Sequence, residues 1–221
     1  MEAPIRVVII DDHRLFAQAL AAALTAEGGC EIVGTAPTLT EGVELVADNQ
    51  VDVVLLDYRL PDTSGLDGVA VILARVPDAA VVMVTASDDE RLLLSAIEAG
   101  CAGFLTKAAD LVEVRSVVRR AAAGESTISP ELLTRLLAQL ARRGSGVGTD
   151  LTGREREVLL EIGVGRTNAE IARALELSVN TVRNYVQAVL TKLGAHSKLE
   201  AAAIAVREGL IDPLSPRPGP G

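Results

Sequence analysis

The sequence of 221 residues is long enough for two domains that each bury a hydrophobic core. Hydrophobic residues make up 49% of it and charged residues 23%, a composition typical of folded chains rather than disordered or fibrous ones. It holds no apolar run of the roughly 18 residues that span a bilayer and no basic, signal-like start, so we expect a cytoplasmic protein with no membrane partner.

The formal net charge of −9 is distributed unevenly along the chain. Residues 1–125 carry 20 acidic and 9 basic side chains, whereas residues 150–211 carry eight of each kind. An acidic first half and a balanced second half indicate two domains with different tasks.

Residues 1–125 alternate short β-branched runs with longer helical patterns, which predicts a (βα)5 domain. Parallel strands need crossover connections, and strands that are apolar throughout need cover on both faces, so we expect a doubly wound parallel sheet between helices. The expected strands are 5–11, 31–36, 51–57, 79–85 and 102–107. The expected helices are 13–27, 39–49, 65–75, 88–99 and 110–123.

Residues 126–149 predict a linker, in which a leucine-striped helix over 129–143 precedes the flexible segment GSGVG at 144–148. The stripe covers barely two turns, so packing is favoured over a zipper. Residues 150–211 contain helical patterns without strand candidates and predict a small all-α domain of four helices. Residues 212–221 contain four prolines and predict a disordered tail.

Polar residues stand at the ends of four of the five expected strands: Asp11 and Asp12, Asp57, Thr85, and Lys107. Carboxyl ends of parallel strands gather functional groups at one edge of a sheet. Three neighbouring carboxylates repel one another unless a cation lies among them, and Mg²⁺ commonly joins carboxylates to phosphate. Each residue alone has an ordinary structural explanation, but the set indicates a phosphoryl site with a carboxylate nucleophile.

The two histidines and two cysteines of the chain lie outside any metal-binding or catalytic spacing. A surface or core role is favoured for His13 and His196, and a free thiol for Cys30 and Cys101.

The second domain has the pattern of a helix-turn-helix. Thr152 and Glu155 have the spacing of a capping box, residues 168–175 form a short amphipathic helix, and Ser178 caps the next helix after a turn. On that helix the expected buried face consists of Val182, Val186, Val189, Leu190 and Leu193, with Tyr185 at its edge. The opposite face consists of Asn180, Arg183, Asn184, Gln187 and Thr191.

Arg, Asn and Gln suit base edges in a DNA groove. Most amphipathic surface helices have a polar face without binding DNA, but no Asp or Glu occurs from Leu177 to Leu199, and this favours attraction to phosphates.

The segments IIDDH, LLDYRLPDTSG, VTAS and GFLTK resemble the signatures of the two-component receiver domain over residues 5 to 123. The resemblance implies strand order 2-1-3-4-5, in which Cys30 and Cys101 cannot meet. It implies that Asp57 accepts the phosphoryl group and that Thr85 and Lys107 hold it. It also implies that Thr85 and Phe104 form the switch, although a packed strand aromatic is an equal alternative for Phe104. It further implies that Mg²⁺ is bound by Asp12, Asp57 and the Arg59 carbonyl, with Asp11 acting through water. By the same resemblance Arg59 and Ser87 tune loss of the phosphoryl group, and Pro61 and Gly65 shape the loop after Asp57.

The segments LTGREREVL, NAEIARALELSVNTVRNYV and VLTKLGAHSKLEA resemble the LuxR-type helix-turn-helix over residues 150 to 205, and with a receiver they indicate the NarL/FixJ family. The resemblance implies base contacts by Arg183, Asn184 and Gln187. It places Asn180, Thr181, Lys192 and Lys198 near the DNA backbone. Tyr185 departs from the histidine that is frequent in the family.

The expected function is that of a transcription regulator rather than an enzyme. A sensor histidine kinase phosphorylates it, and the activated homodimer binds promoter DNA with inverted-repeat half-sites. A hydrolase using Asp57 is one alternative, but Arg59 stands where such enzymes place a general acid. A regulator that works without phosphorylation is the other.

Overall fold

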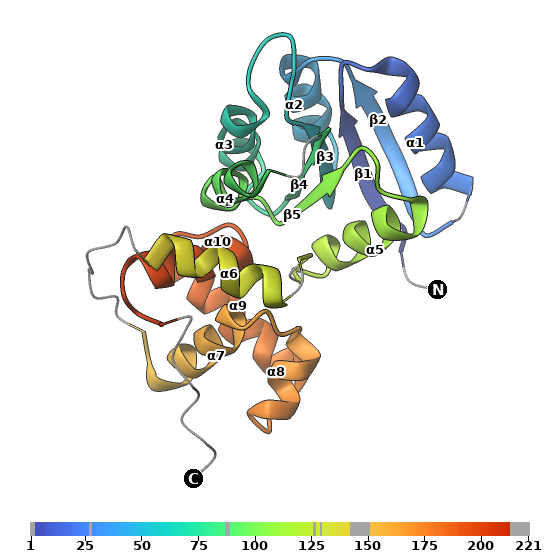
Figure 1. Ribbon diagram of the computed structural model, residues 1–221. Helices are drawn as coiled ribbons and strands as arrows, with labels where there is room; N and C mark the ends of the chain where they lie inside the picture. The colour runs from blue at the N-terminus through green and yellow to red at the C-terminus, as the bar shows by residue number, and fades with distance from the viewer. Residues whose placement is uncertain are drawn as a thin grey trace. The chain divides into compact units, whose positions relative to one another are not determined.

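The chain folds into two compact units, which meet in sequence between Thr127 and Ile128 and are described separately. The computed structural model in Figure 1 describes residues 3–26, 28–86, 89–125, 127–128, 130–141 and 151–212. In this part of the chain, no helix is both long and apolar enough to cross a membrane.

The first unit is a parallel sheet in the order β2-β1-β3-β4-β5, as predicted. Its strands are β1 (Ile5–Ile10), β2 (Cys30–Ala36), β3 (Val53–Asp57), β4 (Ala80–Thr85) and β5 (Gly103–Thr106). Its helices are α1 (Arg14–Ala26), α2 (Leu39–Asp48), α3 (Gly65–Arg75), α4 (Glu90–Glu98) and α5 (Leu111–Ala122). Cys30 and Cys101 are not joined by a disulfide, as expected.

The central strands are covered on both faces, as Figure 1 shows. Successive side chains of a strand point to opposite faces. Val54 and Leu56 of β3 therefore belong to the core under α2 and α3, whereas Val53 and Leu55 belong to the core under α1 and α5. This two-sided burial explains why the expected strands are apolar at nearly every position.

The second unit contains α6 (Pro130–Ala141), α7 (Gly153–Gly163), α8 (Asn168–Ala174), α9 (Val179–Leu193) and α10 (Lys198–Arg207). The helix α6 packs against α10, and its leucines Leu133, Leu136 and Leu137 are buried. The leucine stripe is therefore a packing surface of this unit. The expected hinge at 144–148 and residues 213–221 of the expected tail lie outside the described residues.

Polar caps determine where the helices of the second unit begin. The predicted capping box at Thr152 and Glu155 is present, and Ser178 accepts the backbone N–H of Thr181. A second capping box joins Thr167 and Glu170, which the sequence analysis missed. The T-x-x-E spacing of these two residues is the signal that would have found it.

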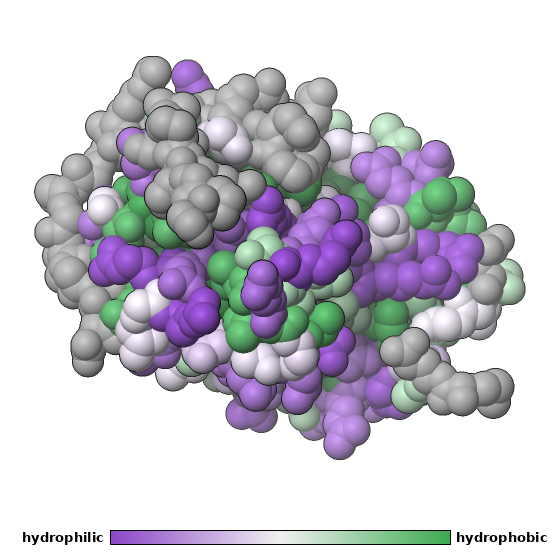
Figure 2. Space-filling model, turned by 90° about the horizontal axis from the view of Figure 1, so that it is seen from below, coloured by the Kyte–Doolittle hydropathy of each residue, from purple (hydrophilic) through white to green (hydrophobic). Residues whose placement is uncertain are grey.

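The exposed surface is mixed in character. Figure 2 shows one face of the molecule, on which hydrophobic residues form separate green areas among hydrophilic ones. Exposed large hydrophobic side chains occur in both units, and the most exposed are Leu15 at 82% and Val112 at 76%, both in the first unit.

Candidate functional sites

The structure brings the polar strand ends of the first unit together at one edge of the sheet. Asp57 ends β3, and Asp11 directly follows β1; both are buried, at 3% exposure. Lys107, just beyond β5, places its Nζ 2.7 Å from Asp57 Oδ2 and 2.7 Å from Asp11 Oδ2. The ammonium also lies 5.0 Å from the centre of the Phe16 ring of α1. One lysine thus contacts two buried carboxylates and offsets part of their charge.

Burial and charge act in opposite directions at these groups. Burial raises the pKa of Asp57 and outweighs the hydrogen bond from Lys107, and the Asp11 charge adds to the rise. Burial opposes the Lys107 ammonium, but hydrogen bonds to Asp11 and Asp57 prevail and raise its pKa. Lys107 is therefore a permanent cation at physiological pH, and it favours the ionised form of Asp57.

The other expected receiver residues surround Asp57. Thr85 ends β4 and is buried, and its carbonyl accepts the Lys107 N–H at 2.6 Å. The Arg59 N–H donates to Asp57 Oδ1 at 3.3 Å, and the Arg59 side chain is exposed. Phe104 is paired with Met83 and packs against the core that includes Ala96 of α4, which matches the packing alternative. Ser87 lies outside the described residues.

The loop after Asp57 is held close to the strand that precedes it. A Cβ at Gly65 would collide with the Asp57 carbonyl oxygen and lie 2.8 Å from the Tyr58 Cα, so only glycine fits this approach. The Gly65 N–H donates to the Tyr58 carbonyl at 2.8 Å. Farther along the loop, Asp62 accepts the Leu39 and Thr40 N–H groups at the start of α2, each at 3.1 Å. The turn that contains Pro61 is closed by a bridge between Arg59 and Ser64.

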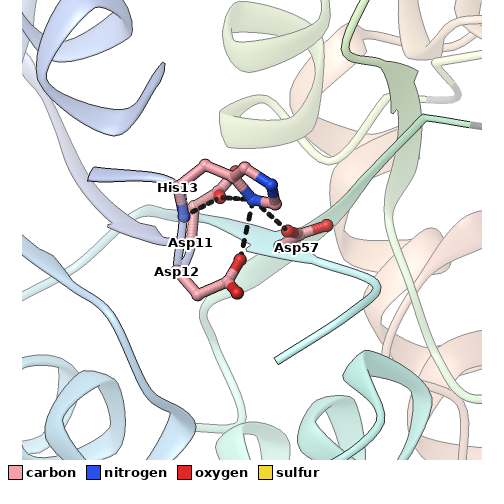
Figure 3. A group of neighbouring side chains, drawn as sticks. All are labelled: Asp11, Asp12, His13 and Asp57. Carbon is pink, nitrogen blue, oxygen red and sulfur yellow. Dashed lines mark hydrogen bonds and ion pairs between the residues drawn. The ribbon is translucent and has the colours of Figure 1, made fainter. Parts of the chain in front are cut away.

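His13 belongs to this site, although the sequence analysis favoured a surface or core role without chemistry for it. Its Nδ1 lies 2.7 Å from Asp12 Oδ1, 3.3 Å from Asp11 Oδ1 and 3.9 Å from Asp57 Oδ2, as Figure 3 shows. Its position directly after Asp11 and Asp12 was the available signal. His13 lies three positions beyond the end of β1 at Ile10 and directly precedes α1.

The acidic cluster fits a divalent cation. Asp11, Asp12, His13 and Asp57 each offer one ligand atom, and these atoms all lie within 4.8 Å of one another. Carboxylate oxygens are the ligands that Mg²⁺ prefers, so the three aspartates have the right chemistry for this ion.

In the second unit, the structure confirms the two faces expected for α9. Val182, Val186 and Val189 are buried, and Leu190, Leu193 and Tyr185 are half-buried. The exposed residues include Asn180, Arg183, Asn184, Gln187 and Thr191, whereas Thr181 is half-buried.

The two lysines expected near the DNA backbone are placed differently. Lys192 is exposed, and its Nζ lies 2.7 Å from Glu155 Oε2 of α7. Lys198 is only 4% exposed, and its Nζ donates to the Arg166 carbonyl at 3.0 Å and to Asn168 Oδ1 at 3.2 Å. The Lys198 ammonium is enclosed by these protein acceptors, and a place for Lys198 near the DNA backbone stays a prediction.

Two family models together match most of the chain. The response regulator receiver domain matches residues 7–119, and the luxR family of bacterial regulatory proteins matches residues 149–205. The probable transcriptional regulatory protein NarL of Mycobacterium tuberculosis is 34% identical over 208 residues, which cover 94% of this chain and 96% of that protein. LiaR of Bacillus subtilis is 31% identical over 210 residues, which cover 94% of this chain and 100% of LiaR.

Solved structures agree with these matches. The receiver domain of the putative response regulator NarL from Mycobacterium tuberculosis is 32% identical with a TM-score of 0.54, and the match covers 56% of this chain and 100% of that one. ChrA, a response regulator of a heme-sensing two-component system, is 28% identical with a TM-score of 0.50, and the match covers 95% of this chain and 100% of ChrA. The chain belongs to the two-component response regulators that join a receiver domain to a LuxR-type DNA-binding domain, the NarL/FixJ family. The relatives named above agree with the expectation of a regulator rather than an enzyme.

Proposed function

We propose that a sensor histidine kinase phosphorylates this protein on Asp57 in a Mg²⁺-dependent reaction, and that phosphorylation controls dimerisation and sequence-specific DNA binding in the cytoplasm. The observation that carries the proposal is the buried Asp57 carboxylate with Lys107 Nζ 2.7 Å away and Asp11 beside it. A buried carboxylate with a fixed ammonium partner is suited to form and hold an acyl phosphate.

The group transfer needs few protein groups. An Asp57 oxygen forms a new bond to phosphorus while the bond from phosphorus to the kinase histidine breaks, and the electron pair of the broken bond stays on the imidazole. Asp12, Asp57 and the Arg59 carbonyl would hold Mg²⁺, with Asp11 in support, and the bound ion would supply positive charge to the phosphoryl oxygens. Lys107 contributes a second fixed charge, and the Thr85 hydroxyl is placed at the end of the neighbouring strand to donate a hydrogen bond.

A kinase must dock close to Lys107 to deliver the phosphoryl group. An apolar pocket between α1 and α5 is lined by Phe16, Leu111 and Lys107 among others. The two most exposed large hydrophobic residues of the described chain, Leu15 and Val112, are the sequence neighbours of Phe16 and Leu111. We propose that the kinase docks on the apolar rim that Leu15, Phe16, Leu111 and Val112 form beside the phosphorylation site.

The second unit supplies DNA recognition. The exposed residues Arg183, Asn184 and Gln187 on α9 are suited to base edges, and Asn180, Thr181 and Lys192 are assigned to the backbone. One such small domain makes a short contact, so two copies on inverted half-sites give usable affinity and specificity.

The experiment is a gel shift on a promoter with inverted half-sites, with and without acetyl phosphate and Mg²⁺. We expect phosphorylation to produce a dimer and to tighten binding in the wild type, whereas Asp57→Ala stays at the unphosphorylated level. If Asp57→Ala behaves like the phosphorylated wild type, the switch is refuted and the alternative regulator that works without phosphorylation is favoured. Sustained hydrolysis of phosphate esters would instead support the hydrolase alternative, which lacks a general acid at Arg59.

A further inference from the structure

We propose that His13 is a nitrogen ligand of the metal site and that it shifts the preference of this receiver from Mg²⁺ toward divalent ions of the first transition series. The inference rests on the proposed metal site at Asp57 and adds a residue that the acid cluster by itself does not require. It gives His13 a role in metal specificity.

The distances match those between ligands of one ion. For metal–ligand bonds of about 2.1 Å, neighbouring ligands of an octahedral ion lie about 3.0 Å apart and opposite ligands about 4.2 Å apart. His13 Nδ1 lies 2.7 Å from Asp12 Oδ1 and 3.3 Å from Asp11 Oδ1, close to the spacing of neighbours. Its distance of 3.9 Å from Asp57 Oδ2 is close to the spacing of opposite ligands.

Lys107 is the cation that the structure places at this cluster. Its Nζ lies 2.7 Å from Asp11 Oδ2, 2.7 Å from Asp57 Oδ2 and 3.4 Å from His13 Nδ1. The Oδ1 atoms of Asp11 and Asp12 lie beside the imidazole and are not the atoms that Lys107 contacts. Asp57 Oδ2 is shared, because an ionised carboxylate oxygen has more than one lone pair and can accept from Lys107 and also contact an ion. The His13 side chain is 67% exposed, so its ring has room to settle on an ion from the solvent side.

The donor type decides which ion gains. Imidazole nitrogen suits Zn²⁺, Cu²⁺, Ni²⁺ and iron, whereas Mg²⁺ prefers oxygen ligands and retains water. A site of three carboxylates with one imidazole therefore favours transition ions more strongly than three carboxylates alone. The competing explanation is that His13 only forms an ion pair with Asp12, in which case removing His13 would leave the metal preference unchanged.

The experiment compares Co²⁺ and Mg²⁺ binding to the full-length protein by titration calorimetry, with the visible absorption of Co²⁺ as a second readout. The variants are His13→Ala and His13→Asn. The matched control is His196→Ala, because His196 is the second of the two histidines and is exposed in the other unit.

We expect both His13 variants to lose about tenfold or more in Co²⁺ affinity. Mutations of residues that only hydrogen-bond to a metal ligand already lower metal affinity by about this factor. Their Mg²⁺ affinity should stay within about twofold of wild type, because Mg²⁺ draws on the carboxylates. The Co²⁺ absorption bands should change in these variants and persist in His196→Ala. An unchanged ratio of Co²⁺ to Mg²⁺ affinity in His13→Ala would overturn this inference alone. If the wild type bound neither ion, or if Asp57→Ala bound both ions as tightly as the wild type does, the proposed metal site would be overturned as well.

Discussion

Glu155 of α7 and Lys192 of α9 join two helices of the second unit, of which α9 is the one assigned to DNA. Lys192 Nζ lies 2.7 Å from Glu155 Oε2, and the same oxygen accepts the Thr152 N–H at 2.6 Å. One carboxylate thus caps α7 and holds α9. The hydrogen bond from Lys192, together with that from Thr152, lowers the pKa of Glu155 to about 2.

This lowered pKa predicts an acid-sensitive second unit. Glu155 contributes stability that is complete above its ordinary pKa of 4.5 and is lost as pH falls from there toward about 2. We expect the protection of α7 and α9 amides against hydrogen exchange, measured relative to their intrinsic exchange rates at each pH, to fall in this window in the full-length protein. Glu155→Gln should be less stable at neutral pH and show a flatter dependence. Glu157→Gln, which removes an exposed partner of Arg154, is the control and should keep the wild-type profile.

Substitutions of Lys198 and Arg183 should have different effects, the first on stability and the second on DNA binding. Lys198→Met removes the buried donor of two hydrogen bonds, to the Arg166 carbonyl and to Asn168 Oδ1, and we expect the free energy of unfolding to fall by about 1–3 kcal/mol. Arg183→Ala changes an exposed side chain, so stability should stay within about 0.5 kcal/mol while DNA binding weakens by about 1–3 kcal/mol. Thermal unfolding and gel shifts measure the two effects. A Lys198→Met protein that is stable but binds DNA weakly would instead support a contact between Lys198 and the DNA backbone.

Glu176 in the turn between α8 and α9 has φ +56°, a left-handed conformation that costs an L-residue about 1–2 kcal/mol. We expect Glu176→Gly to raise the free energy of unfolding by about 0.5–1 kcal/mol and Glu176→Val to lower it, as measured by denaturant unfolding. Gln187→Gly in the middle of α9 should have the opposite sign to Glu176→Gly, because glycine there only weakens a helix. A loss of stability in Glu176→Gly would contradict the prediction.

Gly65 should tolerate no side chain. The atoms that an added Cβ would meet are backbone atoms of Asp57 and Tyr58, which cannot rotate away, so Gly65→Ala should cost about 1–3 kcal/mol and slow phosphorylation of Asp57. Gly153 starts α7 with open space around its Cα, and Gly153→Ala should be neutral or slightly stabilising. Chemical denaturation and acetyl phosphate labelling check both. Equal behaviour of the two variants would argue against the close approach.

The apolar rim of the first unit should distinguish the kinase from a small phosphodonor. Leu15→Glu places a charge at the most exposed hydrophobic position, and we expect phosphotransfer from the cognate kinase to slow about fivefold or more, the equivalent of about 1 kcal/mol. Labelling by acetyl phosphate should not change. Val71→Glu, on the exposed side of α3, is the matched control. Slower labelling by both donors would point to damage within the site instead of lost docking.

Much of this protein follows from its sequence because the relevant information is local. Strand and helix periodicities predicted the (βα)5 unit, and the resemblance to receiver domains implied its strand order. The spacing of Val182, Val186 and Val189 identified the buried face of α9. The polar residues Asp57 and Lys107 could be placed near each other because parallel strands end at a common edge.

Other features depend on groups far apart in the chain, and only tertiary structure decided them. Lys198 has the sequence character of a surface lysine, yet it is buried because its ammonium meets the carbonyl of Arg166, 32 residues away. His13 joins the acidic cluster because its Nδ1 lies 2.7 Å from Asp12 Oδ1 and 3.9 Å from Oδ2 of Asp57, which ends another strand. Burial and electrostatic partnership depend on every group that packs around an atom, and the folded chain assembles those groups from segments that are distant in sequence.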